Sequence, residues 1–313
     1  MGNRFERIQD LLRERADLHA RLRLLPYQGT PEIKERDGKR YLYVRYRVLG
    51  KLTSVYVDVY SDTLYQLLLR NAKEARELNR ALRHAEKQLA ELGYTDENLS
   101  EAVLRNLEFA RANMKLNIYE QAVLEGVATT FPQTETILEN GIVNGVTAND
   151  VQKILNLKHA WEFILDPDVL RSESDYAVLC HIARIVNEGF SFDGGKIRSI
   201  PVRIGGSSYV PPIPSEPDVR EAIDAIVRRA DAPIEIAIGL CLYCMKTQIF
   251  SDGNKRAAVI FANHYLISHG SGLLIVPESD VPAFKTLLVA YYEDRDGGEL
   301  AQFLRDRGWR KFS

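Results

Sequence analysis

The sequence predicts a mainly α-helical protein that carries one small antiparallel sheet near its N-terminus. Over most of the 313 residues, apolar side chains recur at steps of three and four, which is the spacing of one helix face. Only residues 32–60 alternate apolar and polar side chains with a period of two, as strands do. A segment rich in Gly and Pro, residues 194–217, interrupts the later helices and is typical of a hairpin or flap.

Composition narrows the class of protein. Apolar residues make up 45% and charged residues 27%, as in ordinary globular proteins, and the length allows about two domains. A net charge of −2 and a pI of about 6.3 give no overall reason to expect nucleic acid or an anionic membrane as partner. No apolar run approaches the roughly 20 residues of a membrane span. Three cysteines, an odd number, argue against a disulfide framework and predict a reducing, cytoplasmic location.

The first 60 residues are expected to form one helix and a sheet. Residues 4–25 repeat apolar side chains at helical steps, and "PYQGTP" then ends the helix with two prolines and a glycine. An Asp37-Gly38 pair predicts a hairpin turn, and a second break at Gly50 gives about three strands. The middle strand has two predicted faces, one with Leu42, Val44, Tyr46 and Val48, the other with Tyr41, Tyr43, Arg45 and Arg47.

The Tyr and Arg face of that strand has three interpretations. Aromatic and basic side chains on one surface stack bases and pair with phosphates, so nucleic acid is a candidate partner. Lys34, Arg36, Lys39 and Lys51 lie nearby in the sequence and add positive charge. A solvated sheet face or a protein-docking surface would show the same pattern.

Helices predominate from Ser61 onward. Ser61 is expected to cap a long helix whose apolar seam over 68–92 has heptad-like steps and ends at Gly93. A further helix is expected from about residue 99 to Glu125. The seam favours an intramolecular helical hairpin, with a homodimer as the alternative. Four segments are therefore expected: an N-terminal helix with a small sheet (1–60), a helical hairpin or linker (61–112), a set of N-terminal helices of a second module (113–171) and its helical core (172–310).

The stretch "TQIFSDGNKRAA", residues 247–258, holds the residue types that bind a nucleotide. An apolar helix is expected on either side, so Gly253 and Asn254 lie where backbone N–H groups point outward from a helix N-terminus. Lys255 and Arg256 add positive charge, and the Asp252 carboxylate suits Mg²⁺ in the company of phosphate. A capped helix whose charges face solvent would give the same pattern.

"IFSDGNKRAA" resembles the signature loop of the Fic/Doc (Fido) family, H-x-F-x-D/E-G-N-G/K-R. The segments "GKIRSIPVRIGGSSYVPPIPSEP" and "ANHYLISHGSGLLIVP" resemble the family's flap and its closing helix and strand, so the resemblance covers roughly residues 115–310. It implies a Fido-type helical core with a β-hairpin flap that binds ATP, or another nucleotide, with Mg²⁺. Such proteins usually transfer AMP, or another phosphate-containing group, to a hydroxyl of a target protein.

The resemblance also implies roles for the residues of the loop. Asp252 matches the carboxylate that holds the metal. Gly253 and Asn254 match the turn that cradles a phosphate, and Lys255 follows them in the nucleotide-binding run. Arg256 matches the arginine that grips the outer phosphates.

Residues beside the nucleotide site have implied roles as well. Phe250 matches the aromatic side chain that anchors the loop in the core. In the flap, the residues expected to align a segment of the target protein by strand-like pairing are Ile204, Gly205, Gly206 and Tyr209.

Three residues depart from the family pattern. Gln248 occupies the place of the catalytic histidine, and an amide accepts no proton near neutral pH. Lys255 replaces the commoner glycine, as in the Doc branch, which resembles a kinase. Val259 stands where a second arginine usually contacts phosphate.

A possible inhibitory segment precedes the core. Many family members carry a helix with the pattern Ser/Thr-x-x-x-Glu-Gly, and "EQAVLEGVATT" (120–130) resembles it, with Glu125 and Gly126 in place. Gln121 occupies the Ser/Thr position, and Val259 replaces the arginine that commonly pairs with the glutamate. Glu125 could equally be the last residue of a helix that Gly126 ends.

Other candidate residues have simpler interpretations. Cys241 and Cys244 have metal-like spacing but lie in an apolar helix, which favours core packing. His264 and His269 follow the signature loop and are candidates to replace the missing base, although His264 lies two turns beyond Arg256.

Three hypotheses of function remain. The first is a transferase that moves AMP or phosphate to a protein hydroxyl, weakened by Gln248. The second is a pseudoenzyme that binds nucleotide and a partner without chemistry. The third is a module that binds nucleic acid or another partner through the N-terminal sheet, with the Fido-type core as sensor or toxin.

Overall fold

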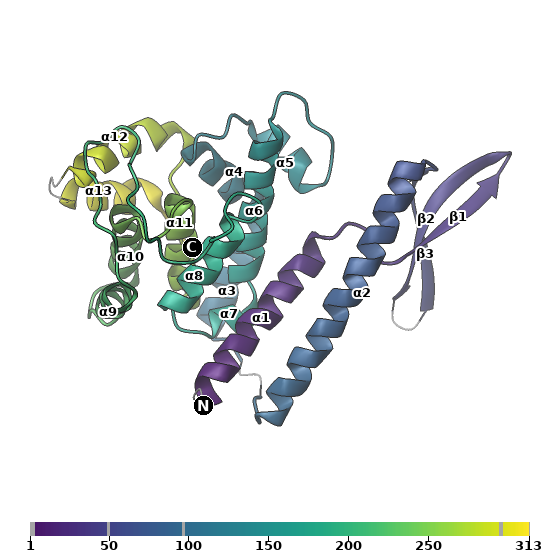
Figure 1. Cartoon of the computed structure of the whole chain (residues 1–313), viewed down its shortest axis with the longest axis horizontal. Helices are drawn as coiled ribbons and strands as arrows, with labels where there is room; N and C mark the ends of the chain where they lie inside the picture. Colours follow the sequence, from purple (N-terminus) through teal and green to yellow (C-terminus); the bar gives the residue numbers. More distant parts are fainter. Residues whose placement is uncertain (1–3, 49–50, 96–97, 294–296, 313) are drawn as a thin grey trace. The chain divides into compact units, whose positions relative to one another are not determined.

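Figure 1 shows a computed structural model of the chain, which is mainly helical and contains a small antiparallel sheet, as the sequence predicts. The structure describes residues 4–48, 51–95, 98–293 and 297–312. The chain forms two compact units, Met1–Asp96 and Glu97–Ser313, called unit 1 and unit 2 below. Among the described residues, no helix combines the length and the apolar character that a membrane crossing requires.

Unit 1 contains a pair of long helices. α1 (Arg4–Leu24) packs against α2 (Asp62–Glu91), with Leu11 and Leu12 buried against Ala85 and Leu89. The expected cap of α2 is confirmed, because the Ser61 hydroxyl accepts a hydrogen bond of 3.2 Å from a backbone N–H of the first helical turn.

The sheet of unit 1 has three antiparallel strands in the order β1 (Thr30–Arg36), β2 (Lys39–Val48) and β3 (Lys51–Val59). Asp37 and Gly38 both have positive φ, 51° and 72°, which is the conformation of the predicted two-residue hairpin turn. Leu42 and Val44 are fully buried against Leu68 of α2. Tyr46 is 40% exposed, so the apolar face ends before that residue.

Two expectations for this sheet cannot be compared with the structure. The predicted break at Gly50 and the side chain of Val48 lie outside the described residues.

Unit 2 is a bundle of helices with one very short sheet. Its helices are α3 (Glu101–Ala112), α4 (Met114–Leu124), α5 (Phe131–Leu138), α6 (Ala148–Ile164), α7 (Pro167–Leu170), α8 (Tyr176–Val186), α9 (Glu216–Val227), α10 (Pro233–Thr247), α11 (Asn254–Ser268), α12 (Val281–Tyr292) and α13 (Gly298–Phe303). The strands β4 (Leu273–Leu274) and β5 (Trp309–Arg310) pair antiparallel.

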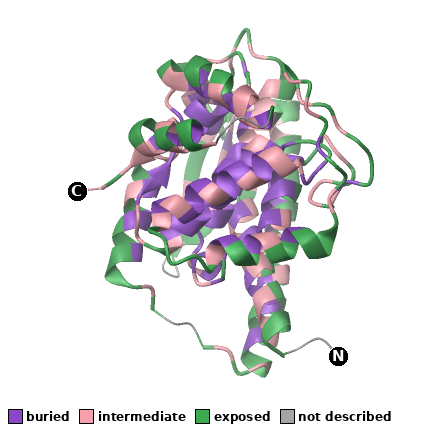
Figure 2. Ribbon diagram, turned by 90° about the vertical axis from the view of Figure 1, so that its left-hand side faces the viewer, coloured by how far each residue is buried: buried purple, intermediate pink, exposed green. Residues whose placement is uncertain are grey.

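α11 lies at the centre of unit 2. Every residue from Arg256 to Ile267 is buried, and the helix packs against α8 and α10. Figure 2 shows the buried residues in purple, gathered on the inner helices. Because α11 is buried along its length, its N-terminus is where it can present polar groups to a ligand in the signature loop described below.

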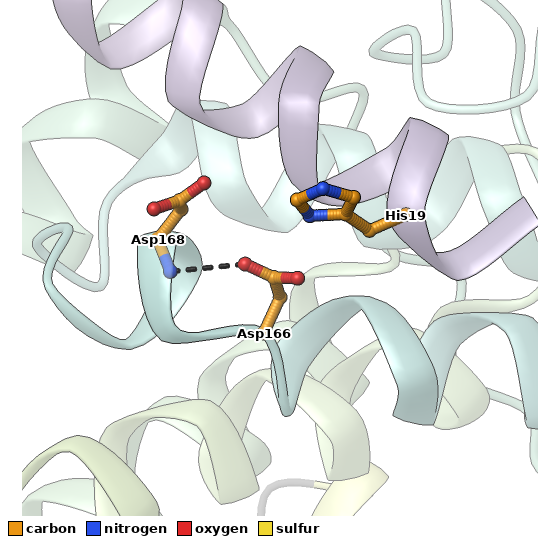
Figure 3. A group of neighbouring side chains, drawn as sticks. All are labelled: His19, Asp166 and Asp168. Atoms are coloured by element: carbon orange, nitrogen blue, oxygen red, sulfur yellow. Dashed lines mark hydrogen bonds between the residues drawn. The ribbon is translucent and has the colours of Figure 1, made fainter. Parts of the chain in front are cut away.

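The turn between α6 and α8 is fixed by local capping. The Asp166 carboxylate accepts a hydrogen bond of 3.0 Å from the backbone N–H of Asp168 at the start of α7 (Figure 3). Pro167 at the first helical position has a φ already suited to the helix. The turn directs the chain into α8, whose C-terminal end contacts the signature loop described below.

The structure divides the helical region differently from the expected segments. The single helix expected over 99–125 is interrupted at Asn113, which ends α3 and begins α4 with φ −101° and ψ 4°. The boundary at residues 96 and 97 falls within the expected hairpin of 61–112, so α2 pairs with α1, and α3 belongs to unit 2.

The flap, residues 194–215, contains no strand, and the expected β-hairpin therefore has no ladder of hydrogen bonds. It is an irregular segment with a turn at Gly205 and Gly206, where the N–H of Ser207 donates to the carbonyl of Ile204 at 3.3 Å. The prolines at 201, 211, 212 and 214 explain the difference, because proline has no N–H to donate to a ladder.

Candidate active site

The candidate site begins where α10 ends. Gln248 follows the last helical residue with φ 48° and ψ 62°, and its backbone N–H donates to the carbonyl of Cys244 at 3.2 Å. A left-handed backbone is unfavourable for a residue with a side chain, so the surrounding contacts must hold it. It turns the chain sharply into the signature loop, residues 248–256.

Buried side chains fix the first half of the signature loop. Ile249 and Phe250 are 0% and 2% exposed, which anchors the loop in the core. The Asn254 amide bridges the loop, since its Nδ2 donates to the carbonyl of Phe250 at 2.7 Å and its Oδ1 accepts from the N–H of Phe250 at 2.9 Å. The Asn254 side chain therefore shapes the turn from inside.

Gly253 is required by both its conformation and its neighbours. Its φ of 74° is left-handed, and a Cβ there would lie 2.6 Å from Oδ1 of Asn187. Asn187 also donates from Nδ2 to the carbonyl of Asp252 at 2.9 Å. α11 then begins without a side-chain cap, so its first N–H groups remain open at the positive end of the helix dipole.

Arg256 is 3% exposed and ties the loop to α8. Its Nη1 donates to the carbonyl of Val186 at 2.6 Å, and its Nη2 lies 3.1 Å from Oδ2 of Asp252. Nε is buried and has no hydrogen-bond partner among the described residues; the nearest acidic atom, Oε2 of Glu125, is 3.6 Å away. A buried N–H without an acceptor is costly, and an anion at this point would satisfy it.

Glu125 lies over the N-terminus of α11. It is the C-cap of α4, its side chain is 14% exposed, and Oε1 lies 3.6 Å from Nζ of Lys255. The carboxylate thus pairs loosely with Lys255 and Arg256, although Val259 supplies no charge. Gly126 follows with φ 81°.

Gln121 fixes α4 in place. Its Nε2 donates to the backbone carbonyl of Arg256 at 2.9 Å, and its Oε1 accepts from the indole N–H of Trp161 at 3.0 Å. Most residues of α4 are buried, so the helix is part of the core and holds Glu125 rigidly.

The Gln248 side chain is bonded at both ends of its amide. Nε2 donates to the carbonyl of Met245 at 2.6 Å, and Oε1 accepts from Nδ2 of Asn254 at 3.1 Å. The amide therefore braces the signature loop, and its carbonyl oxygen already has one donor.

Arg198 holds the flap in place. The sequence alone did not identify it as a site residue. It is 2% exposed, and its guanidinium donates to the carbonyls of Gln248, Ile200 and Pro212. Burial lowers the pKa of this guanidinium, which nevertheless stays charged. A buried arginine could have been suspected from its place between a double glycine and a run of prolines.

The middle of the flap is held by Glu293, the residue that follows α12. The Ser207 hydroxyl and the Ser208 N–H donate to Oε1 of Glu293 at 3.4 and 3.3 Å. The side chain of Tyr209 lies beside Lys246, with Nζ 5.7 Å from the ring centroid.

A cavity of about 600 Å³ brings these elements together. It is lined by parts of the flap, including Ile204 and Gly205, by most of the signature loop and by one side of α12. Its charged lining residues are Glu125, Arg203, Asp252, Lys255 and Lys285. Arg203 and Lys285 were not identified from the sequence, because they come from segments far apart in the chain.

Neither histidine after the loop reaches the cavity. His264 is fully buried, with Nδ1 2.8 Å from the Ser174 hydroxyl and Nε2 2.8 Å from the carbonyl of Val169. Burial lowers the pKa of His264 to about 4. His269 stacks on Tyr265, with ring centroids 4.0 Å apart, near the other end of α11.

The two cysteines of α10 pack in the core. Cys241 and Cys244 are 1% and 2% exposed, and burial raises the pKa of the Cys241 thiol to about 12. No group of possible metal ligands surrounds them in the part of the chain that the structure describes.

Comparisons with known proteins show what this site is similar to. Residues 173–266, which lie within unit 2, match a family model described as Fic/DOC family. Residues 5–66 match another model, described as a domain of unknown function (DUF6788).

One curated protein and two solved structures are similar to this chain in sequence or in fold. Protein adenylyltransferase fic-1 of Caenorhabditis elegans is 25% identical over 199 residues, which are 61% of this chain and 38% of that protein. A structure of Fic-1 from C. elegans covers 78% of this chain and 73% of its own, with a TM-score of 0.51 and 20% identity. A Fic domain containing signaling protein from Bacteroides thetaiotaomicron covers 67% and 86%, with a TM-score of 0.51 and 16% identity. These likenesses show the fold.

Proposed function

We propose that unit 2 binds a nucleotide with Mg²⁺ in the 600 Å³ cavity and transfers AMP slowly to a hydroxyl of a target protein. The supporting observation is that one cavity joins the open N-terminus of α11, an exposed carboxylate and three cationic side chains to the flap. The resemblance to adenylyltransferases suggests the group transferred, and the chain spans only 38% of the relative that carries that name.

Several groups support phosphate binding. The free N–H groups of α11 and the side chain of Lys255 lie at one wall of the cavity. Arg203 and Lys285 line it from the flap and from α12, and neither has a hydrogen bond or an ion pair among the described residues. Their positive charge can bind phosphate in place of the arginine that Val259 replaces.

Asp252 is suited to hold Mg²⁺. Its side chain is 64% exposed, only Oδ2 contacts Arg256, and Oδ1 has no partner among the described residues. Carboxylate oxygens are preferred ligands of this ion. When bound, Mg²⁺ neutralises phosphate charge and polarises the phosphoryl oxygens.

The flap supports docking of an extended segment. The backbone N–H groups of residues 202–206 have no hydrogen-bond partner in the part of the chain that the structure describes. An incoming strand would pair with such groups. The residues that we propose for this contact are Ile204, Gly205, Gly206 and Tyr209.

In the proposed reaction, the target hydroxyl oxygen forms a bond to the α-phosphorus of ATP. The bond from that phosphorus to the oxygen of the β-phosphate breaks, and diphosphate leaves. Gln248 can orient the hydroxyl but cannot keep its proton, which therefore passes to water. Arg203, Lys255 and Lys285 can still position the phosphates and stabilise the negative charge of the transition state without a base at position 248. These two effects supply much of the catalysis in phosphoryl transfer.

A second candidate function is nucleotide binding without transfer. One observation favours it: the Gln248 amide is already bonded to Met245 and Asn254, so little of its hydrogen-bonding capacity is left for a hydroxyl. Both candidates require the same nucleotide site.

The test is calorimetric titration of the full chain with ATP, GTP, CTP and UTP in the presence of Mg²⁺. Wild type should bind at least one of them, and Glu125→Gln should tighten binding about fivefold, because loss of the carboxylate frees Lys255 and Arg256 for phosphate. The matched control is Glu221→Gln, the same change at an exposed position of α9, which should leave the affinity unchanged. Absence of binding to all four nucleotides at millimolar concentration would overturn the proposal.

A further inference from the structure

The sheet of unit 1 presents a surface that the nucleotide site does not use. β2 directs Leu42 and Val44 against α2, so the alternate side chains point to the opposite side. There, strand pairing sets Lys34 of β1 opposite Tyr41, and Tyr56 of β3 opposite Tyr43. We call this surface the outer face and define it by Lys34, Tyr41, Tyr43, Arg45, Arg47 and Tyr56.

The three tyrosines of the outer face form one aromatic cluster. The ring of Tyr56 lies 5.6 Å from that of Tyr43 and 6.3 Å from that of Tyr41, and Tyr56 is 49% exposed. Nζ of Lys34 lies 4.3 Å from the centroid of Tyr43. Rings that are packed together in this way lose little conformational entropy when a flat ligand stacks on them.

Positive charge exceeds negative charge on the outer face, where Glu32 interacts with both Lys34 and Arg45. Its acidic neighbour Glu32 accepts a hydrogen bond of 2.9 Å from Ser54 and lies 3.6 Å from Lys34. Arg45 and Arg47 are exposed, and neither has a salt bridge or a hydrogen bond among the described residues.

The two units differ in net charge. Unit 1 contains 19 Lys and Arg against 14 Asp and Glu, whereas unit 2 contains 22 against 29. The overall charge of −2 therefore conceals a unit of +5 and a unit of −7. A polyanion would be attracted to unit 1 and repelled by unit 2.

We propose that the outer face binds single-stranded nucleic acid. Unpaired bases would stack on the tyrosine cluster, and Lys34, Arg45 and Arg47 would pair with phosphates. Aromatic side chains on the open face of a small antiparallel sheet can reach the faces of unpaired bases, which are inaccessible within a duplex. This combination of rings and charges favours a single strand over other anionic partners.

The test is fluorescence anisotropy of the full chain with labelled 20-mers of single-stranded DNA, single-stranded RNA and duplex DNA over a salt series. We expect a single strand to bind more tightly than the duplex, and its affinity to fall with salt with a log–log slope of about −2, as three cationic contacts imply. Tyr43→Ala should weaken binding at least about fivefold, which is the lower end of the contribution of one stacked base. Tyr43→Phe keeps the ring and should retain the affinity.

Charge reversal supplies the matched comparison. Arg45→Glu with Arg47→Glu should weaken binding at least about tenfold and flatten the salt slope by about 1.4. Arg80→Glu with Arg83→Glu makes the same change at exposed positions of α2 and should have less than a twofold effect. Failure of wild type to bind at low salt, preference for the duplex, or an equal loss in the α2 variant would each overturn the proposal.

Discussion

Gln248 is held in an unfavourable backbone conformation by contacts that involve its own side chain. The left-handed φ of 48° costs on the order of 1 kcal/mol for a residue with a Cβ. Two hydrogen bonds of its amide offset this cost, one donated to the carbonyl of Met245 and one accepted from Nδ2 of Asn254. Gln248 therefore stabilises the signature loop whether or not it takes part in a reaction.

The first prediction concerns a change of Gln248 to histidine. An imidazole can accept the proton of the attacking hydroxyl, and a positioned general base contributes about 10²–10⁴-fold to the rate. Incubation with labelled ATP and cell lysate should therefore give stronger labelling of protein bands by Gln248→His than by wild type.

Gln248→Ala is the control for that comparison, because it removes the amide without supplying a base. It should label no more strongly than wild type. Strong labelling by wild type that falls in Gln248→His would show that the glutamine suits a different reaction, and the general-base argument would then be wrong for this protein.

At the scale of elements, the flap is ordered without secondary structure of its own. The guanidinium of Arg198 bonds the carbonyl of Ile200 near one end and those of Pro211 and Pro212 near the other. It also reaches the carbonyl of Gln248 in the signature loop. One buried side chain thus joins the flap to the signature loop.

The second prediction is that Arg198→Ala loosens the flap and destabilises unit 2. Loss of the guanidinium leaves several carbonyls without donors, so the free energy of unfolding should fall by about 3 kcal/mol. Hydrogen exchange of residues 199–215 should become faster. Arg198→Lys keeps the charge but offers one nitrogen in place of three, and its effect should be intermediate. Unchanged exchange in Arg198→Ala would contradict the role given to this residue.

The sequence predicted correctly those elements that depend on local patterns, and it failed where a break or a loop has no strong local signal. α1, the Asp37-Gly38 turn and the Ser61 cap depend on local patterns, and the structure has them where these patterns predict. The break at Asn113 was missed because asparagine within an apolar repeat interrupts a helix less strongly than glycine or proline does. The flap was expected to pair as strands, and the effect of its prolines on a ladder was underestimated.

The candidate site shows a similar limit. Its signature loop is contiguous in the sequence, so its residue types and its resemblance to the Fic/Doc signature could locate it. Contacts between distant segments, such as Glu125 with Lys255 or Lys285 beside the loop, depend on how helices pack. A local pattern does not contain that information.

At the scale of the whole molecule, the burial of α11 makes stability depend on pH. His264 lies within this helix without contact to water, and its pKa is lowered to about 4 chiefly by burial. In the unfolded chain a histidine has a pKa of about 6.5. Between these values the unfolded state binds a proton that the folded state does not bind, so acid favours unfolding.

The third prediction is a loss of stability as the pH falls from about 6.5 to about 4. His264 should contribute a decrease of about 3 kcal/mol in the free energy of unfolding over that interval, since one pKa unit corresponds to about 1.4 kcal/mol. Urea unfolding of wild type and His264→Gln from pH 7.5 to pH 4 measures the difference in slope. Equal slopes in the two proteins would show that other groups cause the acid sensitivity.

The Arg198 contacts have a consequence for recognition that goes beyond stability. A side chain that bonds both ends of the flap closes it into a ring without a covalent cross-link. Closing such a ring costs chain entropy that rises with the logarithm of its length, and this cost arises when the protein folds, before any partner arrives. When a segment pairs with the flap, the entropy that remains to be lost is therefore mainly that of the segment itself. For the pairing that we propose at the flap, stiff, extended segments should accordingly bind more tightly than flexible ones of the same composition, and Arg198 would influence that affinity without touching the segment.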